Sequence, residues 1–296
     1  MQAPDVRLRV LLDQTDAGLA PGTAVGAGSQ ELARLYASPR GIPSARWVRT
    51  NMVSTLDGAA TGADGRSGSI NTGADKVVFD LLRAWSDGIL VGAQTVRTEG
   101  YGPARTADEW LSMRAGRARH PTMVVVTGSG RLPETFLEEA AEGSDPAHAG
   151  TLEATPQGGA AEREAAGDVL VVTAGACPAD RLADLRARLG RDRVLALAGE
   201  RVDVAIALDA LAERGLARVL AEGGPHLLAD LVEADVVDEW CHTIVSRVVG
   251  GDAPRIVNTG GSVTLGLRLR PRLLLEAGGD LIGTWVRPTP HTAIGE

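Results

Sequence analysis

Strand-like and helix-like segments alternate along most of this 296-residue chain, and this alternation limits the possible folds more than any other feature. Short valine-rich runs, such as 122–127 and 168–173, predict buried strands. Segments such as 179–190 place leucines at helical spacing. Because parallel strands need long crossovers, we predict an α/β fold with a mostly parallel central sheet flanked by helices. Apolar runs on both sides of Gly278-Gly279-Asp280 predict an antiparallel C-terminal hairpin.

The composition argues against several classes of protein. The formal net charge is −8, which is unfavourable for a dominant nucleic-acid or anionic-membrane surface. No apolar run approaches the roughly 20 residues of a membrane span, and the N-terminus lacks a secretory signal. Cys177 and Cys241 are too few for a disulfide framework, and the scattered histidines, which we expect to be structural or exposed, lack metal-ligand spacing. We therefore expect a cytoplasmic protein without a metal, a nucleic-acid partner or a membrane partner.

The chain is long enough for one large domain. We predict an N-terminal extension at 1–44, partly loop, a single domain at 45–287 and a short tail at 288–296. Segment 138–167 has almost no large apolar side chains, so it has little surface to bury, and we predict a flexible insertion there.

The most informative local pattern is the turn from Glu222 through Gly223 and Gly224 to Pro225. It follows a predicted strand and opens a predicted helix, and proline suits the first helical turn. The free N–H groups of such a helix start attract phosphate, although a plain tight turn gives the same pattern. A carboxylate at this end of a strand lies where open α/β sheets bind ligands, but a solvated charge is the simpler interpretation of Glu222 taken alone.

Other candidates follow the strand at 47–54. Asp57 and Gly58 begin a glycine-rich loop that carries Ser67 and Ser69, small hydroxyls that suit a sugar or phosphate. Arg83, on the helix predicted at 72–85, either reaches the surface or binds a phosphate. Thr95 begins a helix after another buried strand. The chain contains neither a Walker P-loop nor a Rossmann fingerprint.

Four segments in order carry a family resemblance: N-M-V-S-T-L-D-G, S-G-S-I-N-T, L-L-R-A-W-S-D-G-I-L-V-G-A-Q-T-V and A-E-G-G-P-H-L-L-A-D-L. Together they resemble the riboflavin-biosynthesis pyrimidine reductases, over about residues 45–285. The resemblance implies a dihydrofolate-reductase-like fold, a homodimer and NADPH as hydride donor. It also implies a ribosylaminopyrimidine 5′-phosphate substrate, whose ribose is reduced at C1′, and a reductase without a preceding deaminase domain.

Carried over by position, the resemblance implies roles for individual residues. The NADPH site would comprise Val53, Ala60, Thr61, Thr95, Glu99, Gly223, Gly224, Pro225, His226 and Leu227. The substrate site would comprise Asn51, Ser67, Ser69, Arg83 and Glu222. Catalytic roles would fall to Glu222, near the reacting carbon, and to Asp57, which would help to build the site.

One segment departs from the family pattern. Glu99 stands where the family often has aspartate in T-x-x-x-D-x-P, and this chain reads T-V-R-T-E-G-Y-G-P. Two alternatives therefore stay open. One is a pteridine or dihydrofolate-type reductase, since one fold serves many substrates. The other is a nucleotide-binding sensor that has lost turnover.

Overall fold

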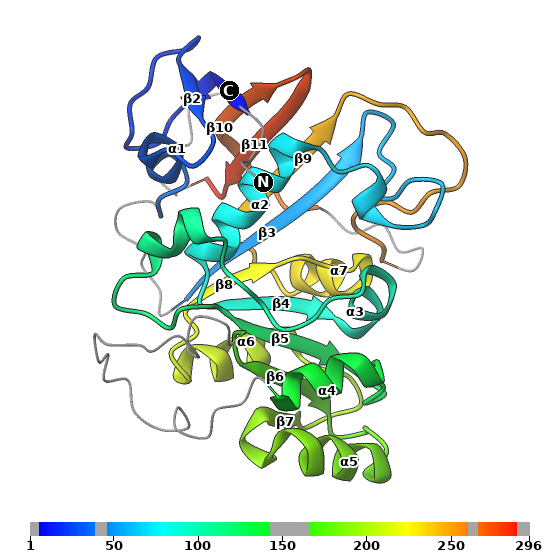
Figure 1. The fold of residues 1–296 in the computed structure, drawn as a ribbon. Coiled ribbons are helices and arrows are strands. Elements are labelled where there is room, and N and C mark those ends of the chain that lie inside the picture. Colours follow the sequence, from blue (N-terminus) through cyan, green and yellow to red (C-terminus); the bar gives the residue numbers. More distant parts are fainter. Residues whose placement is uncertain (1–5, 39–45, 143–165, 260–265, 289–296) are drawn as a thin grey trace. The chain divides into compact units, whose positions relative to one another are not determined.

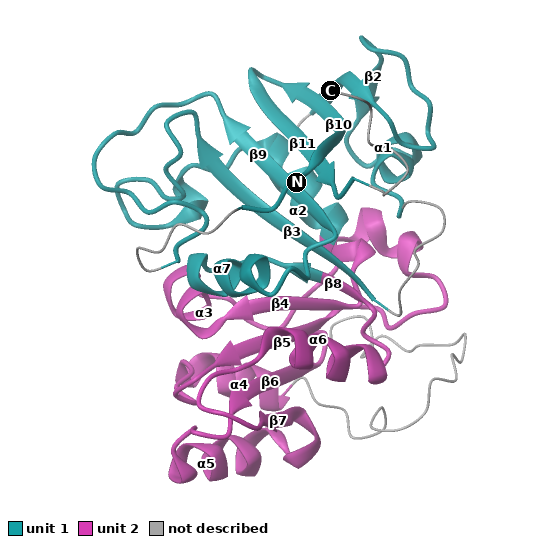
Figure 2. Ribbon diagram, turned by 180° about the vertical axis from the view of Figure 1, so that it is seen from behind, with its two compact units in different colours: residues 1–82, 220–296 teal, residues 83–219 magenta. Residues whose placement is uncertain are grey.

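The computed structural model describes residues 6–38, 46–142, 166–259 and 266–288. The chain divides into two compact units (Figure 2). Unit 1 comprises residues 1–82 and 220–296, and unit 2 comprises residues 83–219. The predicted tail, apart from residue 288, lies outside the described residues.

Unit 1 contains the antiparallel strands of the fold (Figure 1). Its sheet has the order β2-β1-β10-β11-β9-β3, in which only β9 and β3 are parallel to each other. The hairpin β10–β11 turns at Gly278-Gly279, both at positive φ, as predicted. The strands are β1 (Arg7–Asp13), β2 (Ala24–Gly26), β3 (Trp47–Thr55), β9 (Glu239–Val245), β10 (Arg270–Ala277) and β11 (Asp280–Val286). The helices are α1 (Gln30–Leu35), the short 3-10 helix η1 (Ser67–Ser69) and α7 (Pro225–Glu233).

Unit 2 contains the parallel order β4-β5-β6-β7. Every residue of β6 is buried, as expected for a strand inside a parallel sheet that is covered on both faces. The strands are β4 (Gly88–Gly92), β5 (Thr122–Thr127), β6 (Val169–Ala174) and β7 (Val194–Leu197). The helices are α3 (Ala93–Glu99), η2 (Asp108–Arg114), α4 (Glu134–Glu142), α5 (Ala179–Leu189), η5 (Arg191–Arg193) and α6 (Val204–Glu213).

Two elements continue across the boundary between the units along the chain: α2 (Gly73–Trp85) and β8 (Arg218–Ala221). Helix α2 starts with Thr72 Oγ1 accepting the Asp75 N–H at 3.4 Å, the side-chain contact of a helix N-cap. The predicted α/β class, with a mostly parallel sheet and a C-terminal hairpin, is confirmed.

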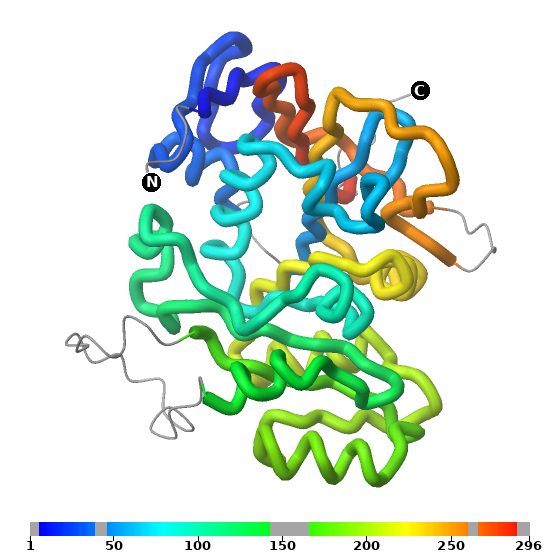
Figure 3. The backbone as a smooth tube through the Cα atoms, turned by 45° about the vertical axis from the view of Figure 1, so that its right-hand side comes forward, coloured from blue at the N-terminus to red at the C-terminus, as the bar shows by residue number. Residues whose placement is uncertain are grey.

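The N-terminal segment has more structure than its sequence indicated. Strand β1 pairs with β10, so the blue N-terminal part of the chain runs beside the red hairpin in Figure 3. Leu8 and Val10 are fully buried, and β2 pairs with β1. Residues 7–13 therefore belong to the unit 1 sheet, and the hairpin is not its edge.

The insertion predicted at 138–167 starts too early. Residues 138–142 are the C-terminal half of α4, and Ala140 packs in the unit 2 core. The alanines in this half of the helix suit close packing, whereas the sequence analysis interpreted the lack of large apolar side chains as an inability to fold. Residues 143–165 lie outside the described residues.

Candidate active site

The β8–α7 turn has the form predicted from Glu222 to Pro225. Gly224 is the N-cap of α7 and Pro225 its first residue. The first-turn N–H groups of His226 and Leu227 have no partner within an α-helix, and glycine offers no capping side chain. This helix start suits an anion such as a cofactor phosphate.

The two glycines of this turn differ in backbone conformation. Gly223 has φ +88°, which favours glycine, whereas Gly224 has φ −70°, which any residue adopts. The peptide between them is cis. A Cβ added at Gly223 would lie 3.5 Å from Met52 Cε on β3. The conformational requirement therefore falls on Gly223 rather than on Gly224.

Glu222 is buried, with only 7% of its surface exposed. The alternative of a solvated charge is therefore wrong for this residue. A carboxylate held at the carboxyl end of a strand, directly before a helix start, is suited to holding or moving a proton.

Asp57 links the loop after β3 to the loop after β9 by hydrogen bonds. Its carboxylate accepts hydrogen bonds from Thr55 Oγ1 at 2.5 Å, Gly250 N at 2.7 Å and Val249 N at 3.2 Å. The Thr55 hydroxyl and these backbone N–H groups lower the pKa of Asp57. Because the carboxyl group stays ionised at neutral pH, it is a poor proton donor, and its contacts support the site-building role.

Segment 249–258, which the sequence analysis did not single out, holds two parts of the predicted cofactor site. Ala60 donates its N–H to Pro254 O at 2.8 Å, and Thr61 follows it in the chain. Asn258 donates its N–H to Pro225 O at 3.1 Å, at the start of α7. Unit 1 thus connects the loop after β3 to the β8–α7 turn through one segment.

The side chains of β3 divide between two faces because a strand alternates. Met52 lies on one face, together with His242 of the paired strand β9. Asn51 and Val53 lie on the other face, with Cys241 and Thr243. Met52 therefore contacts the Gly223 turn, whereas the side chains of the predicted residues Asn51 and Val53 do not share its face.

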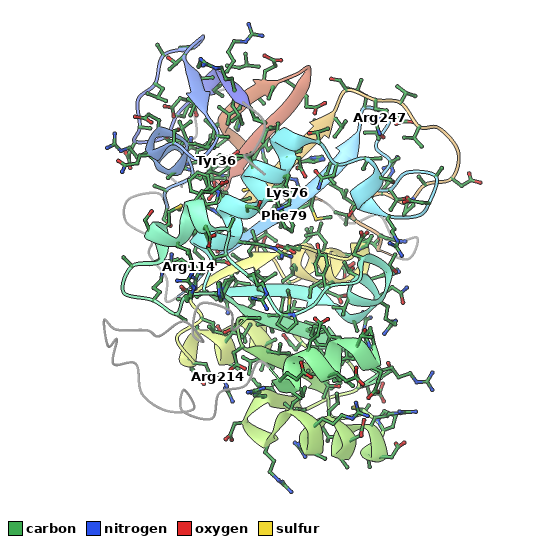
Figure 4. All side chains as sticks on the ribbon, viewed as in Figure 1. Tyr36, Lys76, Phe79, Arg114, Arg214 and Arg247 are labelled. Atoms are coloured by element: carbon green, nitrogen blue, oxygen red, sulfur yellow. The ribbon has the colours of Figure 1, made fainter. Side chains whose placement is uncertain are left out.

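The two predicted serines of η1 differ in their contacts. Ser69 Oγ donates toward Asp64 Oδ1 at 2.7 Å and Arg66 O at 2.8 Å, and Ser69 O accepts from Arg247 at 3.1 Å (Figure 4). The Ser69 hydroxyl is thus committed to its own loop. Ser67 is partly exposed.

Three predicted residues lie in unit 2. Arg83 is on the last turn of α2, and its guanidinium carbon lies 5.2 Å from the centre of the Tyr101 ring. Thr95 is in the first turn of α3, and Glu99 ends that helix before Gly100, at φ +73°. Both side chains are partly exposed.

The histidines of the described residues differ in their surroundings. His120 is buried and accepts the Thr106 N–H at 2.9 Å through Nδ1, whereas His226, which the resemblance places in the cofactor site, is exposed. His242 lies 2.9 Å from Ser54 Oγ, and burial lowers its pKa to about 4, so it is neutral at pH 7. His148 and His291 lie outside the described residues.

A buried carboxyl group that the sequence analysis did not single out lies on α2 in unit 1. Asp75 is 4% exposed, faces the Thr243 hydroxyl and has its pKa raised to about 6, first by burial and then by Asp280. A raised folded-state pKa stabilises the fold below the unfolded pKa, and this stabilisation is lost as the pH rises through 6.

We expect Asp75→Asn to be more stable than the parent at pH 7.5 by about 2–3 kcal/mol, since each pKa unit corresponds to about 1.4 kcal/mol. At pH 4 the difference should nearly vanish. Urea unfolding at both pH values measures it, and an equal difference at pH 4 and pH 7.5 would contradict the assignment.

In the part of the chain that the structure describes, no three or more histidine, cysteine, aspartate or glutamate side chains cluster as metal ligands do. No helix among the described residues has the length and apolar character to cross a membrane.

Comparison with known proteins gives consistent matches. A sequence profile of the RibD C-terminal domain matches residues 46–283. The 2,5-diamino-6-ribosylamino-4(3H)-pyrimidinone 5′-phosphate reductase of Methanothermobacter thermautotrophicus is 29% identical over 80% of this chain and 95% of its own length. The riboflavin biosynthesis protein RibD of Chlamydia trachomatis is 32% identical over 69% of this chain but 47% of its own length.

A solved structure has the same fold. A pyrimidine reductase-like protein from Corynebacterium diphtheriae aligns with a TM-score of 0.69 and 22% identity, over 86% of this chain and 96% of that protein. The match supports the predicted fold of the riboflavin-pathway pyrimidine reductases.

Proposed function

We propose a specific reaction from the premise that this chain belongs to the RibD C-terminal domain family. Membership makes the chain an oxidoreductase of the riboflavin-pathway pyrimidine reductase type. The proposed reaction is the NADPH-dependent reduction of a ribosylaminopyrimidine 5′-phosphate at ribose C1′. The observation that carries the proposal is the buried carboxylate of Glu222, directly before the uncapped N-terminus of α7.

The residues of unit 1 fit a dinucleotide cofactor. The N–H groups of His226 and Leu227, with the dipole of the nine-residue helix α7, suit a phosphate. Gly223, at positive φ, allows the backbone to turn there without a side chain. When bound, NADPH would supply the hydride for the reduction. Ala60 and Thr61, held by segment 249–258, would flank its nicotinamide.

The remaining residues would bind and orient the substrate. Arg83 carries a planar fork of N–H donors that matches a phosphate, and we assign it to the substrate 5′-phosphate. Ser67 would contact the ribose, and Thr95 and Glu99 would contact the cofactor. Glu222 would manage a proton near C1′, since its burial limits exchange with water.

We also propose that the protein is a homodimer. One face of the unit 1 sheet carries apolar side chains that are only partly buried. Helix α2 lies on the other face (Figures 1 and 2), where its Asp75 meets Thr243. The apolar side chains lie side by side through the β9–β11 and β10–β11 register: Trp240, Ile244, Leu274, Leu281 and Trp285. Such a face suits a second copy of the chain. A single-chain mass in light scattering would contradict this.

The test of the reaction is direct. Purified protein is mixed with NADPH and 2,5-diamino-6-ribosylamino-4(3H)-pyrimidinone 5′-phosphate, and the reduced-nicotinamide absorbance is followed while mass spectrometry detects the ribityl product. We expect loss of absorbance and a product two mass units heavier. Turnover of dihydrofolate alone would favour the pteridine-type alternative, and NADPH binding without oxidation by either compound would favour the sensor.

A further inference from the structure

The loop that follows α3 contains an aromatic ring beside Arg83. Tyr101 lies two residues after Glu99, and its ring centre is 5.2 Å from the Arg83 guanidinium carbon. This distance is within the range of a cation–π contact. Both residues belong to unit 2. The ring is therefore placed to restrict the orientation of the guanidinium.

The Tyr101 ring is itself fixed. It packs against the apolar core of unit 2, the cluster that includes Val96, Ala104 and Phe136. Its backbone N–H donates to Val96 O at 3.2 Å, at the end of α3. A ring held by the core provides a rigid surface for a flexible side chain.

The backbone that carries Arg83 is fixed as well. Ser86 donates both its N–H and its hydroxyl to Arg83 O, at 3.2 and 2.9 Å. Arg114 and Arg117 then donate to the carbonyls of residues 84–86, with Arg117 also paired to Asp87 at 3.0 Å. Figure 4 shows Arg114 near this end of α2. Two cations at a helix C-terminus also complement its dipole.

With the backbone and the ring both fixed, the guanidinium of Arg83 has little freedom. The N–H donors of a guanidinium lie in its own plane, in a geometry that matches a phosphate. A preorganised guanidinium loses less conformational entropy when it binds a phosphate. We propose that Tyr101 is a positioning residue that orients Arg83 toward the substrate's phosphate. This inference rests on the role proposed above for Arg83.

The experiment compares Tyr101→Phe, Tyr101→Leu, Arg83→Ala and the double variant Arg83→Ala/Tyr101→Leu. Phenylalanine keeps the ring, and leucine keeps the apolar packing but removes the ring. KM and kcat are measured for the pyrimidine substrate with and without its 5′-phosphate. Titration with ribose 5-phosphate and with ribose, followed by calorimetry, repeats the comparison without turnover.

We expect Tyr101→Leu to raise KM for the phosphorylated substrate about three- to tenfold, from the usual strength of a cation–π contact, with kcat retained. Tyr101→Phe should stay within about twofold of the parent, because phenylalanine keeps the ring face that makes the contact. Arg83→Ala should raise the same KM about ten- to hundredfold, and Tyr101→Leu should add nothing to it.

Three results would overturn the inference. Equal losses on the phosphorylated and dephosphorylated substrates would make Tyr101 a packing residue, and a further loss in the Arg83→Ala background would show that it acts independently of Arg83. If Arg83→Ala itself shows no phosphate-specific loss, both assignments fail. In that case, NADPH-dependent reduction of the dephosphorylated substrate by the parent protein would still test the proposed reaction independently of the roles of Arg83 and Tyr101.

Discussion

Glu222→Gln should lower kcat by about a hundredfold or more, the usual contribution of a positioned proton-transferring group. Glutamine keeps the size of the side chain but cannot hold or release the proton. Since the side chain is 7% exposed, bulk water is a poor substitute for it. NADPH affinity, measured by fluorescence titration, should change little, because the proposed cofactor contacts are backbone N–H groups of α7.

The matched control is Glu233→Gln, an exposed glutamate at the other end of α7. It makes the same chemical change in the same helix, and we expect parental kcat. A folded Glu222→Gln variant that keeps kcat within about twofold of the parent would show that the carboxylate has no role in proton transfer.

Glu239→Gln should reduce the free energy of unfolding by about 3–5 kcal/mol, the usual cost of removing one partner from a buried ion pair. Glu239 is fully buried on β9 and accepts from Arg49 Nε at 2.6 Å, Arg272 at 3.2 Å and Trp47 Nε1 at 3.2 Å. The variant leaves two arginines in the core of unit 1 without their carboxylate. The total free energy of unfolding of a folded protein is commonly about 5–15 kcal/mol, so the variant would lose a large part of its stability.

Urea unfolding of the parent and the variant measures the loss. Glu276→Gln is the control, since it breaks an ion pair with Arg9, whose side chain is 59% exposed. Such a surface pair contributes about 0–1 kcal/mol. Equal, small losses for both variants would contradict the importance assigned to the buried pair.

The buried ion pair also shows what the sequence could not predict. Arg49 and Glu239 are 190 residues apart and become neighbours because β3 and β9 pair in parallel, with these two residues in register. The sequence analysis interpreted 47–54 as an alternating strand, and a charged residue inside it gave no indication of its partner. Glu239, which begins β9, can be identified as the partner of Arg49 only from the pairing of the two strands.

The candidate site also has parts that the sequence predicted and parts that it could not predict. Glu222, Gly223, Gly224 and Pro225 were predicted as a strand end, a turn and a helix start, and the structure contains those elements. The contacts of segment 249–258, which hold the loop after β3 and the start of α7, could not be predicted. Neither could the contact of Tyr101 with Arg83, on which the proposed positioning role rests.

The sequence by itself determined the order and type of most elements, the fold class and the turn before α7. These follow from local periodicity, glycine and proline, whose effects act within one strand or helical turn. Only the tertiary structure decided that β1 pairs with β10, that α4 continues to Glu142 and that Glu239 meets Arg49 and Arg272. Those outcomes depend on which distant segments become neighbours, and no short window of sequence encodes them because their partners lie many residues away.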